Sequence, residues 1–208
     1  MGEVIQMKHK IRDGEKRQFI FDSEMRARSD DTMEVEGYAL KFDKETVIGG
    51  KWGWTERINK AALDEADLSN VVFNFNHSLD SLLAGTRNKS LTLTTDSIGL
   101  KINARIVDTT MGRDVYQLIK DGLITQMSFW AVIKTSSWTW ANEDDTEAMD
   151  EREILSFGRF IDVSAVTFPA YEDTELAARS LGGIDMQLIK QIQYEKQIRK
   201  MEKILGGK

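Results

Sequence analysis

The stretch LTLTTDSIGLKINARIVD, residues 91–108, decides what kind of fold the chain is expected to have. Apolar and polar residues alternate through two runs that flank Asp96-Ser97, and Gly99 follows the break. A period of two is typical of a half-buried strand, and a short polar break with a glycine close behind it predicts a hairpin. This part of the chain is therefore expected to form two antiparallel strands.

Similar strand patterns lie on both sides of this hairpin. They occupy residues 33–42, 71–76, 124–135 and 154–168. Residues 109–123 instead predict a helix, which Thr109 or Thr110 caps and Gly122 ends. The expected fold class is mainly β (α+β), with an antiparallel β-barrel core, flanking helices and a C-terminal helix.

Three segments are predicted along the chain. Residues 1–31 mix basic and acidic side chains, which is typical of a charged N-terminal arm. Residues 32–180 hold the strand patterns and form the predicted domain. Residues 181–208 form a predicted amphipathic helical tail, which docks on a partner, self-associates or is a simple surface helix.

The composition narrows the classes of function. The 208 residues carry a formal net charge of −6, which disfavours nucleic acid as a partner. No apolar run approaches the ~20 residues that a membrane span needs. Cysteine is absent and there are two histidines, so thiolate chemistry is excluded and a zinc site would depend on carboxylates. We expect no metal and no cofactor.

His77 is the first candidate for acid–base chemistry. It lies in VVFNFNHSLDSLLAGT, residues 71–86, where an alternating pattern breaks into a polar turn. The other histidine, His9, lies in the charged arm. Imidazole titrates closer to neutral pH than other side chains, so His77 could be a general base. A structural role in hydrogen bonding is an equal alternative at this point.

Ser128 is the candidate nucleophile, because its hydroxyl lies in a strand between two large apolar residues and needs a backbone partner or a chemical role. Lys134 lies ~20 Å away at ~3.3 Å per residue, too far for a serine–lysine pair. The carboxylate that would orient His77 is either Asp162 or Glu153, and the residues alone do not rank them.

Four segments together resemble one protein family. They are NFNHSLDSLLAGT, LTLTTDSIGLKINARI, DGLITQMSFWAV and FIDVSAVTFPAYEDTE, and they follow one another between Gly37 and Ala178. Their order is similar to that in the prohead (capsid maturation) serine proteases of tailed bacteriophages. The resemblance implies the fold of the herpesvirus assemblin proteases, a β-barrel surrounded by helices.

The resemblance also implies roles for three residues. The family's nucleophile falls on Ser128 and its base on His77, which are 128 − 77 = 51 residues apart. The third member is usually a glutamate just before V-S, and falls here on Asp162, which is one methylene shorter. The implied chemistry is acyl transfer by a Ser-His-acid triad. Residues 83–87 are candidate oxyanion donors, because Gly85 permits close backbone approach.

The implied biological role is cleavage inside the immature phage capsid, in the host cytoplasm. The substrates would be the major capsid protein, in its scaffolding region, and the protease itself. Arg28-Ser29 and Arg179-Ser180 are candidate self-cleavage points at the edges of the domain. The herpesvirus enzymes work as dimers, so a homo-oligomer is an expectation here.

Two alternatives stay open. The chain could be a non-catalytic capsid-assembly (scaffolding) protein of the same fold, in which the arm and the tail are the working parts. It could also be an unrelated β-rich binding module, in which His77 is structural. The ligand surface would then be formed by Trp52, Trp54, Trp138 and Trp140.

Overall fold

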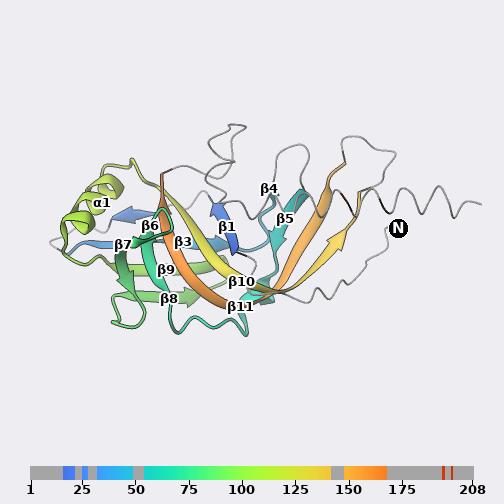
Figure 1. Ribbon diagram of the computed structural model, residues 1–208, viewed down its shortest axis with the longest axis horizontal. Helices are drawn as coiled ribbons and strands as arrows, with labels where there is room; N and C mark the ends of the chain where they lie inside the picture. The colour runs from blue at the N-terminus through green and yellow to red at the C-terminus, as the bar shows by residue number, and fades with distance from the viewer. Residues whose placement is uncertain are drawn as a thin grey trace, which may run out of the picture.

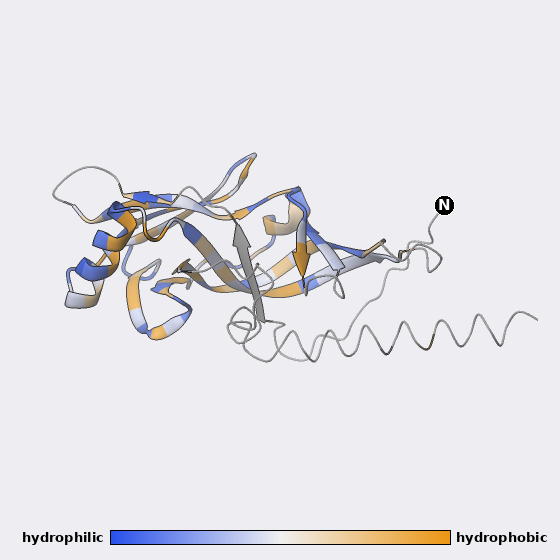
Figure 2. Ribbon diagram, turned by 90° about the horizontal axis from the view of Figure 1, so that it is seen from above, coloured by the Kyte–Doolittle hydropathy of each residue, from blue (hydrophilic) through white to orange (hydrophobic). Residues whose placement is uncertain are grey.

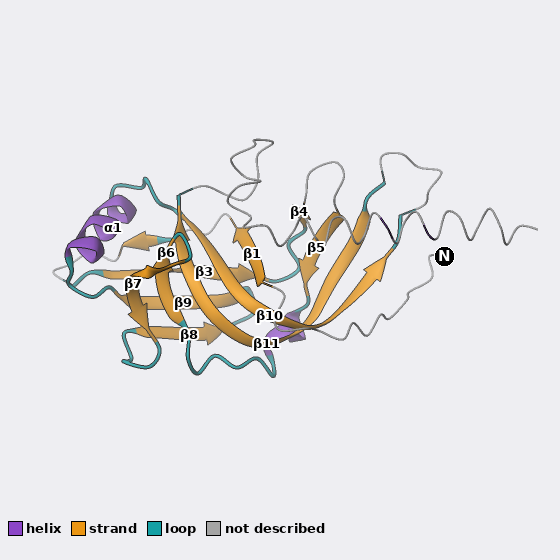
Figure 3. Cartoon of the chain, viewed as in Figure 1, coloured by secondary structure: helices purple, strands orange, loops and turns teal. Residues whose placement is uncertain are grey.

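The computed structural model describes residues 16–21, 25–27, 32–48, 54–141 and 148–167, together with residues 194 and 198. Strands dominate this part of the chain and belong to two sheets (Figure 3). The prediction of a mainly β protein is therefore confirmed. The predicted C-terminal tail lies outside the described residues, except that residues 194 and 198 are helical.

The smaller sheet contains the stretch that suggested a β fold. Its strands, in spatial order, are β2 (Arg26–Ala27), β3 (Glu34–Lys41), β9 (Gly99–Arg105) and β8 (Leu91–Thr95). The strands β8 and β9 pair in antiparallel register, with Leu91 opposite Ala104 and Thr95 opposite Leu100. Asp96 closes the turn by accepting the backbone N–H groups of Ile98 and Gly99. The predicted hairpin is confirmed.

The larger sheet is organised around two long strands. They are β10 (Gln126–Thr139) and β11 (Asp150–Val166), which pair in antiparallel fashion. The remaining strands are β1 (Lys16–Phe21) on β10, β5 (Trp54–Ile58) and β6 (Val72–Phe75) on β11, β4 (Thr46–Ile48) on β5, and β7 (Ser78–Gly85) on β6. Figure 1 shows β10 and β11 running from the end of the molecule that carries β6 and β7 to the end that carries β4 and β5.

The predicted antiparallel barrel needs correction. Within the described residues both sheets are open, and β11 pairs with β5 and with β6 in parallel. The first part of β11 lies beside β5 and its last part beside β6, so one strand has two successive neighbours on one edge. Residue alternation reports that a segment is a strand, but it does not report the direction of its neighbour. The strand β1 lies within the segment predicted as an arm and pairs with β10 along its length.

The described α-helix is α1 (Thr110–Lys120), as the sequence predicted. Thr109 caps it by accepting the backbone N–H of Gly112, and Gly122 follows its end at a φ of 72°. Val115 and Ile119 are buried on one side of the helix, and Figure 2 shows hydrophobic and hydrophilic residues on its different sides. A short 3₁₀ helix, η2 (Lys60–Leu63), precedes β6.

Side chains from both sheets form one hydrophobic core. Phe129, Phe157 and Phe160 pack at its centre, with ring centroids 5.1–5.7 Å apart. Each fully buried side chain of this size stabilises the fold by about 1.5–3 kcal/mol. Because β10 and β11 supply this cluster, the strands that carry Ser128 and Asp162 are held rigidly by the core beneath them.

A second, smaller cluster contains three of the four tryptophans that the binding-module alternative assigns to a ligand surface. Trp54 begins β5 and is buried, and it packs against Trp138 with ring centroids 5.6 Å apart. Trp140 stacks on Trp138 at 5.3 Å. Trp52 lies outside the described residues. Trp54 and Trp138 are therefore packing residues, which removes them from the ligand surface of the binding-module alternative.

Candidate active site

Three neighbouring strands place polar side chains in one row. Ser128 on β10 lies opposite Ser164 on β11, and Ser164 lies opposite Asn74 on β6. The next row along these strands is apolar and consists of Phe129, Val163 and Phe73. Successive residues of a strand point to opposite faces, so the apolar row joins the core and the polar row lies on the other face.

Asp162 lies on the same face as this polar row, two residues before Ser164. It occupies a position diagonal to Ser128 on the paired strand. Ser128, Asp162, Ser164 and Asn74 all have 0% exposed surface. Burying four polar side chains together is costly unless they satisfy one another or have a chemical role, so the row is a candidate site.

His77 reaches this face from a tight turn. Phe75 pairs with Ser78, which leaves Asn76 and His77 as the two-residue loop between β6 and β7. The φ angles are 52° at Asn76 and 56° at His77. Positive φ at both positions is what a type I′ hairpin turn requires, and glycine is the usual second residue of such a turn. His77 therefore occupies a backbone position where a side chain is unfavourable.

The imidazole of His77 joins Ser128 to Asp162. Nδ1 lies 2.7 Å from Asp162 Oδ1, and Nε2 lies 2.8 Å from Ser128 Oγ. An ionised carboxylate only accepts hydrogen bonds, so Nδ1 carries the proton and Nε2 accepts from the serine hydroxyl. The side chain of His77 is 14% exposed. The imidazole thus reaches the solvent, while the hydroxyl and the carboxylate lie beneath it.

One protein family matches most of the chain. The family described as caudovirus prohead serine protease matches residues 21–187. The chain belongs to this family. A prohead protease family carries a serine peptidase activity in phage capsid maturation, which is the class of function that the resemblance implied. No curated protein and no solved structure matches the chain.

The other residues considered for the prohead protease site lie elsewhere. Glu153 accepts a hydrogen bond from Asn59 and pairs with Arg57. Lys134 pairs with Glu65. The structure therefore brings Asp162, and not Glu153, to His77, and the catalytic role of these residues is argued below as a proposal.

The loop considered for oxyanion binding has two amides that already have partners. The N–H of Gly85 donates to Ser90 Oγ, and the N–H of Thr86 donates to the carbonyl of Val71. Both groups hold the end of β7 in place. Gly85 and Thr86 therefore do not supply free donors for an oxyanion.

Sequence reasoning missed Ser164 and Asn74. The N–H of His77 donates to Ser164 Oγ at 2.8 Å, and the hydroxyl of Ser164 donates to Asn74 Oδ1 at 2.6 Å. Both residues alternate with buried apolar neighbours, as in VVFNFN and IDVSAV. A polar residue recurring on the second face of an otherwise apolar strand is the signal that could have found them.

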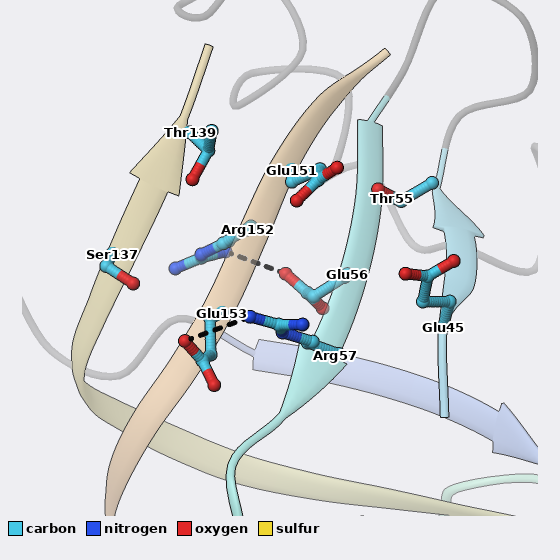
Figure 4. Close-up of a pocket in the computed structure, with 9 residues that line it drawn as sticks. All are labelled: Glu45, Thr55, Glu56, Arg57, Ser137, Thr139, Glu151, Arg152 and Glu153. Atoms are coloured by element: carbon cyan, nitrogen blue, oxygen red, sulfur yellow. Dashed lines mark hydrogen bonds and ion pairs between the residues drawn. The ribbon is translucent and has the colours of Figure 1, made fainter. Parts of the chain in front are cut away.

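A second polar region lies at the other end of β10 and β11. Figure 4 shows a pocket there, lined by Glu45, Thr55, Glu56, Arg57, Ser137, Thr139, Glu151, Arg152 and Glu153. Arg152 pairs with Glu56 at 3.3 Å across β11 and β5, and Arg57 pairs with Glu153 at 3.5 Å. None of the residues around His77 lines this pocket. Two of its four glutamates, Glu56 and Glu153, pair with its two arginines, which is typical of a structural ion-pair cluster.

The described residues contain no group of three or more side chains suited to holding a metal ion. Within the same part of the chain, no helix is both long enough and apolar enough to span a bilayer. The arrangement around His77 consists of a hydroxyl, an imidazole and a carboxylate. Its available chemistry is proton transfer and nucleophilic attack by the hydroxyl.

Proposed function

We propose that this chain is a serine endopeptidase of prohead maturation, with Ser128 as nucleophile, His77 as general base and Asp162 as the acid that orients the imidazole. Its substrates are the scaffolding region of the major capsid protein and the protease chain itself. The proposal is carried by the two hydrogen bonds of one imidazole, 2.8 Å to Ser128 Oγ and 2.7 Å to Asp162 Oδ1. A hydroxyl, imidazole and carboxylate joined in this order activate a serine for acyl transfer.

The mechanism follows from the direction of these hydrogen bonds. Ser128 Oγ attacks the carbonyl carbon of the scissile peptide bond while its proton passes to His77 Nε2. The C–N bond then breaks, and the imidazolium gives the proton to the leaving amine, so an ester forms on Ser128. Water, deprotonated by the same imidazole, hydrolyses the ester. Asp162 holds the Nδ1–H tautomer and stabilises the imidazolium throughout.

The backbone of His77 supports a functional role. A φ of 56° is unfavourable for a residue with a side chain, and glycine would adopt it without strain. Residues other than glycine seldom adopt a positive φ, so the backbone of His77 calls for an explanation beyond packing. Strain that persists at one residue of a polar, buried cluster favours a site kept for chemistry.

Labelling with a fluorophosphonate, which bonds covalently to activated serines, tests the proposal. We expect the wild type to be labelled on Ser128, as located by peptide mass mapping, and Ser128→Ala and His77→Ala to remain unlabelled. His77→Gly is the sharper variant, because it should match or exceed the wild-type Tm while losing the label. A folded wild type that takes no label would overturn the proposal and favour the non-catalytic capsid-assembly role.

Substrate and self-cleavage are tested together by co-expression with the phage's major capsid protein. We expect shortened capsid protein with the wild type, and new N-termini at Ser29 or Ser180 of the protease. Neither of these bonds lies within the described residues. Ser128→Ala should leave both proteins intact. If the capsid protein is cleaved while the protease stays intact, self-cleavage is refuted and the endopeptidase activity is supported.

A further inference from the structure

The backbone of His77 is fastened to the strand that carries its carboxylate partner. Its N–H donates to Ser164 Oγ at 2.8 Å, and the preceding N–H, of Asn76, donates to the carbonyl of Ala165 at 2.9 Å. Asp162 lies two residues before Ser164 on the same face of β11. One strand therefore fixes both the position of the imidazole and the position of the carboxylate that it must meet.

The hydroxyl of Ser164 has one orientation that satisfies its neighbours. It accepts the N–H of His77, so its single proton is free to be donated. The shortest acceptor is Asn74 Oδ1 at 2.6 Å, whereas the carbonyls of Asn74 and Ala165 lie at 3.2 and 3.5 Å. Asn74 thus orients Ser164, and Ser164 holds His77.

Asn74 is buried although its amide is incompletely satisfied. It has 0% exposed surface, and within the described residues its Nδ2 has no hydrogen-bond partner. A buried donor without a partner is unfavourable, and leucine at this position would avoid that cost. The useful group is therefore Oδ1, the acceptor of the Ser164 hydroxyl.

We infer that Ser164, oriented by Asn74, is a positioning residue that sets the depth of His77 over β11. This inference rests on the proposed function. The aspartate side chain is short, and it reaches Nδ1 at 2.7 Å because the turn is held down on the same strand. Without the Ser164 hydroxyl, the N–H of His77 loses its partner and the strained turn at residues 76 and 77 relaxes away from Asp162.

The first test compares Ser164→Ala with Ser90→Ala. Ser90 is a matched control, because its hydroxyl is also buried, accepts a backbone N–H and donates to an asparagine Oδ1, but it holds the loop after β7. We expect Ser164→Ala to lower kcat about 10–100-fold with KM nearly unchanged, because small misplacements of catalytic groups act on the chemical step. Ser90→Ala should keep wild-type kcat. Equal losses in both variants would overturn the inference.

Conservative replacements separate positioning from packing. Ser164→Thr keeps the hydroxyl, so its kcat should be close to that of the wild type. Asn74→Leu removes the acceptor of that hydroxyl and should lower kcat, as Ser164→Ala does. Labelled active sites are counted in each variant, so that poor folding is not read as slow chemistry. A slow Ser164→Thr with a full count of active sites would contradict the role of the hydroxyl.

A double substitution tests the link to the length of the acid. Asp162→Glu adds one methylene and should lower kcat in the wild-type background, because the depth of His77 suits the shorter side chain. In the Ser164→Ala background the turn is no longer fixed, so the fold-decrease in kcat caused by Asp162→Glu should be several-fold smaller. An identical fold-change in both backgrounds would show that Ser164 and Asp162 act independently.

A spectroscopic measurement keeps this inference separate from the proposed function. The Nδ1–H proton of His77, bonded to a carboxylate, should give a downfield NMR resonance that is absent from His77→Gly. We expect this resonance to broaden or move upfield in Ser164→Ala and to persist in Ser90→Ala, whether or not the protein is active. An unchanged resonance in Ser164→Ala would refute positioning, whereas an inactive wild type would refute only the peptidase.

Discussion

The two ends of β11 both bury polar side chains, but they satisfy them in opposite ways. Beside β5, the charged groups of Arg152 and Glu56 pair with each other at 3.3 Å, and the guanidinium lies 5.3 Å from the centre of the Trp138 ring. Beside β6, the row of Ser128, Ser164 and Asn74 is neutral, and Asp162 is the carboxylate that it adjoins. At one end a buried arginine and a buried glutamate pair with each other, whereas the other end holds one carboxylate for one imidazole.

Under the proposed function, this difference separates a structural cluster from a reactive one. The charges of Arg152 and Glu56 offset each other, and the net contribution of such a buried pair to stability is small because desolvation offsets attraction. Asp162 has an oxygen, Oδ2, without a hydrogen-bond partner among the described residues. Its negative charge is therefore stabilised chiefly by the imidazole, and the proposed mechanism makes this interaction strongest when the imidazole is protonated.

The largest effect is expected from Asp162→Asn. The amide cannot accept and hold the Nδ1–H of His77 as the carboxylate does, so the tautomer is lost and kcat should fall by about 10⁴-fold. The fold should remain close to the wild type, because the two side chains have the same shape. Fluorophosphonate labelling rates and cleavage of capsid protein measure the loss, and thermal unfolding measures the stability.

Glu153→Gln is the control for this prediction, because it neutralises a carboxylate on the same strand near the ion-pair end. Glu153 is partly exposed and bonded to Arg57 and Asn59. We expect labelling and cleavage within about two-fold of the wild type, since surface ion pairs contribute little. A severe loss in Glu153→Gln would break the proposed division between the two ends of β11.

The next largest effect is a loss of stability at the ion-pair end. Arg152→Met keeps much of the packing on Trp138 but leaves the buried Glu56 without its cation, which should lower the free energy of unfolding by about 3–5 kcal/mol. The rate of labelling per folded molecule should be unchanged. Urea denaturation and active-site titration measure the two quantities separately.

Two further variants check that the loss of stability in Arg152→Met comes from a buried charge left without a partner. Glu56→Gln in the Arg152→Met background should recover part of the stability, because no uncompensated charge then remains buried. Arg57→Met removes the neighbouring pair, whose arginine side chain is 48% exposed, and should cost no more than about 1 kcal/mol. If Arg152→Met abolished labelling in fully folded protein, the two ends of β11 would be functionally coupled.

The local elements of this fold could be predicted, and their assembly could not. The hairpin at residues 91–105 and the capped helix α1 are encoded in short patterns of alternation, capping and glycine placement. The parallel neighbours of β11 depend on contacts between segments that are distant in the chain. Such pairings leave no local signature, so an all-antiparallel barrel was the default expectation.

In the candidate site, too, some residues could be predicted from the sequence and others could not. Ser128 and His77 were recognisable as candidates from the residues, and the family resemblance favoured a chemical role for both and selected Asp162. From the residues alone, Asp162 and Glu153 were equivalent, because the choice depends on which end of β11 lies beside β6. Ser164 and Asn74 were missed because their role is to hold a backbone amide, and no sequence pattern reports a tertiary hydrogen bond.

The smallest effect is expected from an exposed carboxylate, Asp96, which belongs to neither end of β11. It accepts hydrogen bonds from the hydroxyl of Tyr38 and from the N–H groups of Ile98 and Gly99. The bond from Tyr38, offset in part by desolvation and aided by the two amides, holds the pKa of Asp96 below its usual value of 3.8. The charged form is therefore stabilised in the folded protein, but solvent weakens the effect.

Asp96→Asn should accordingly lower the free energy of unfolding by less than about 1 kcal/mol at pH 7. Because the folded pKa is depressed, the contribution of the carboxylate is complete above its unfolded pKa and is lost as the pH falls through the folded one. Urea denaturation at pH 7 and below pH 3.8 should thus show the two proteins converging in acid, with Asp114→Asn on the exposed face of α1 as control. A difference that persists unchanged in acid would mean that the asparagine alters the turn itself, and that the charge of Asp96 contributes nothing.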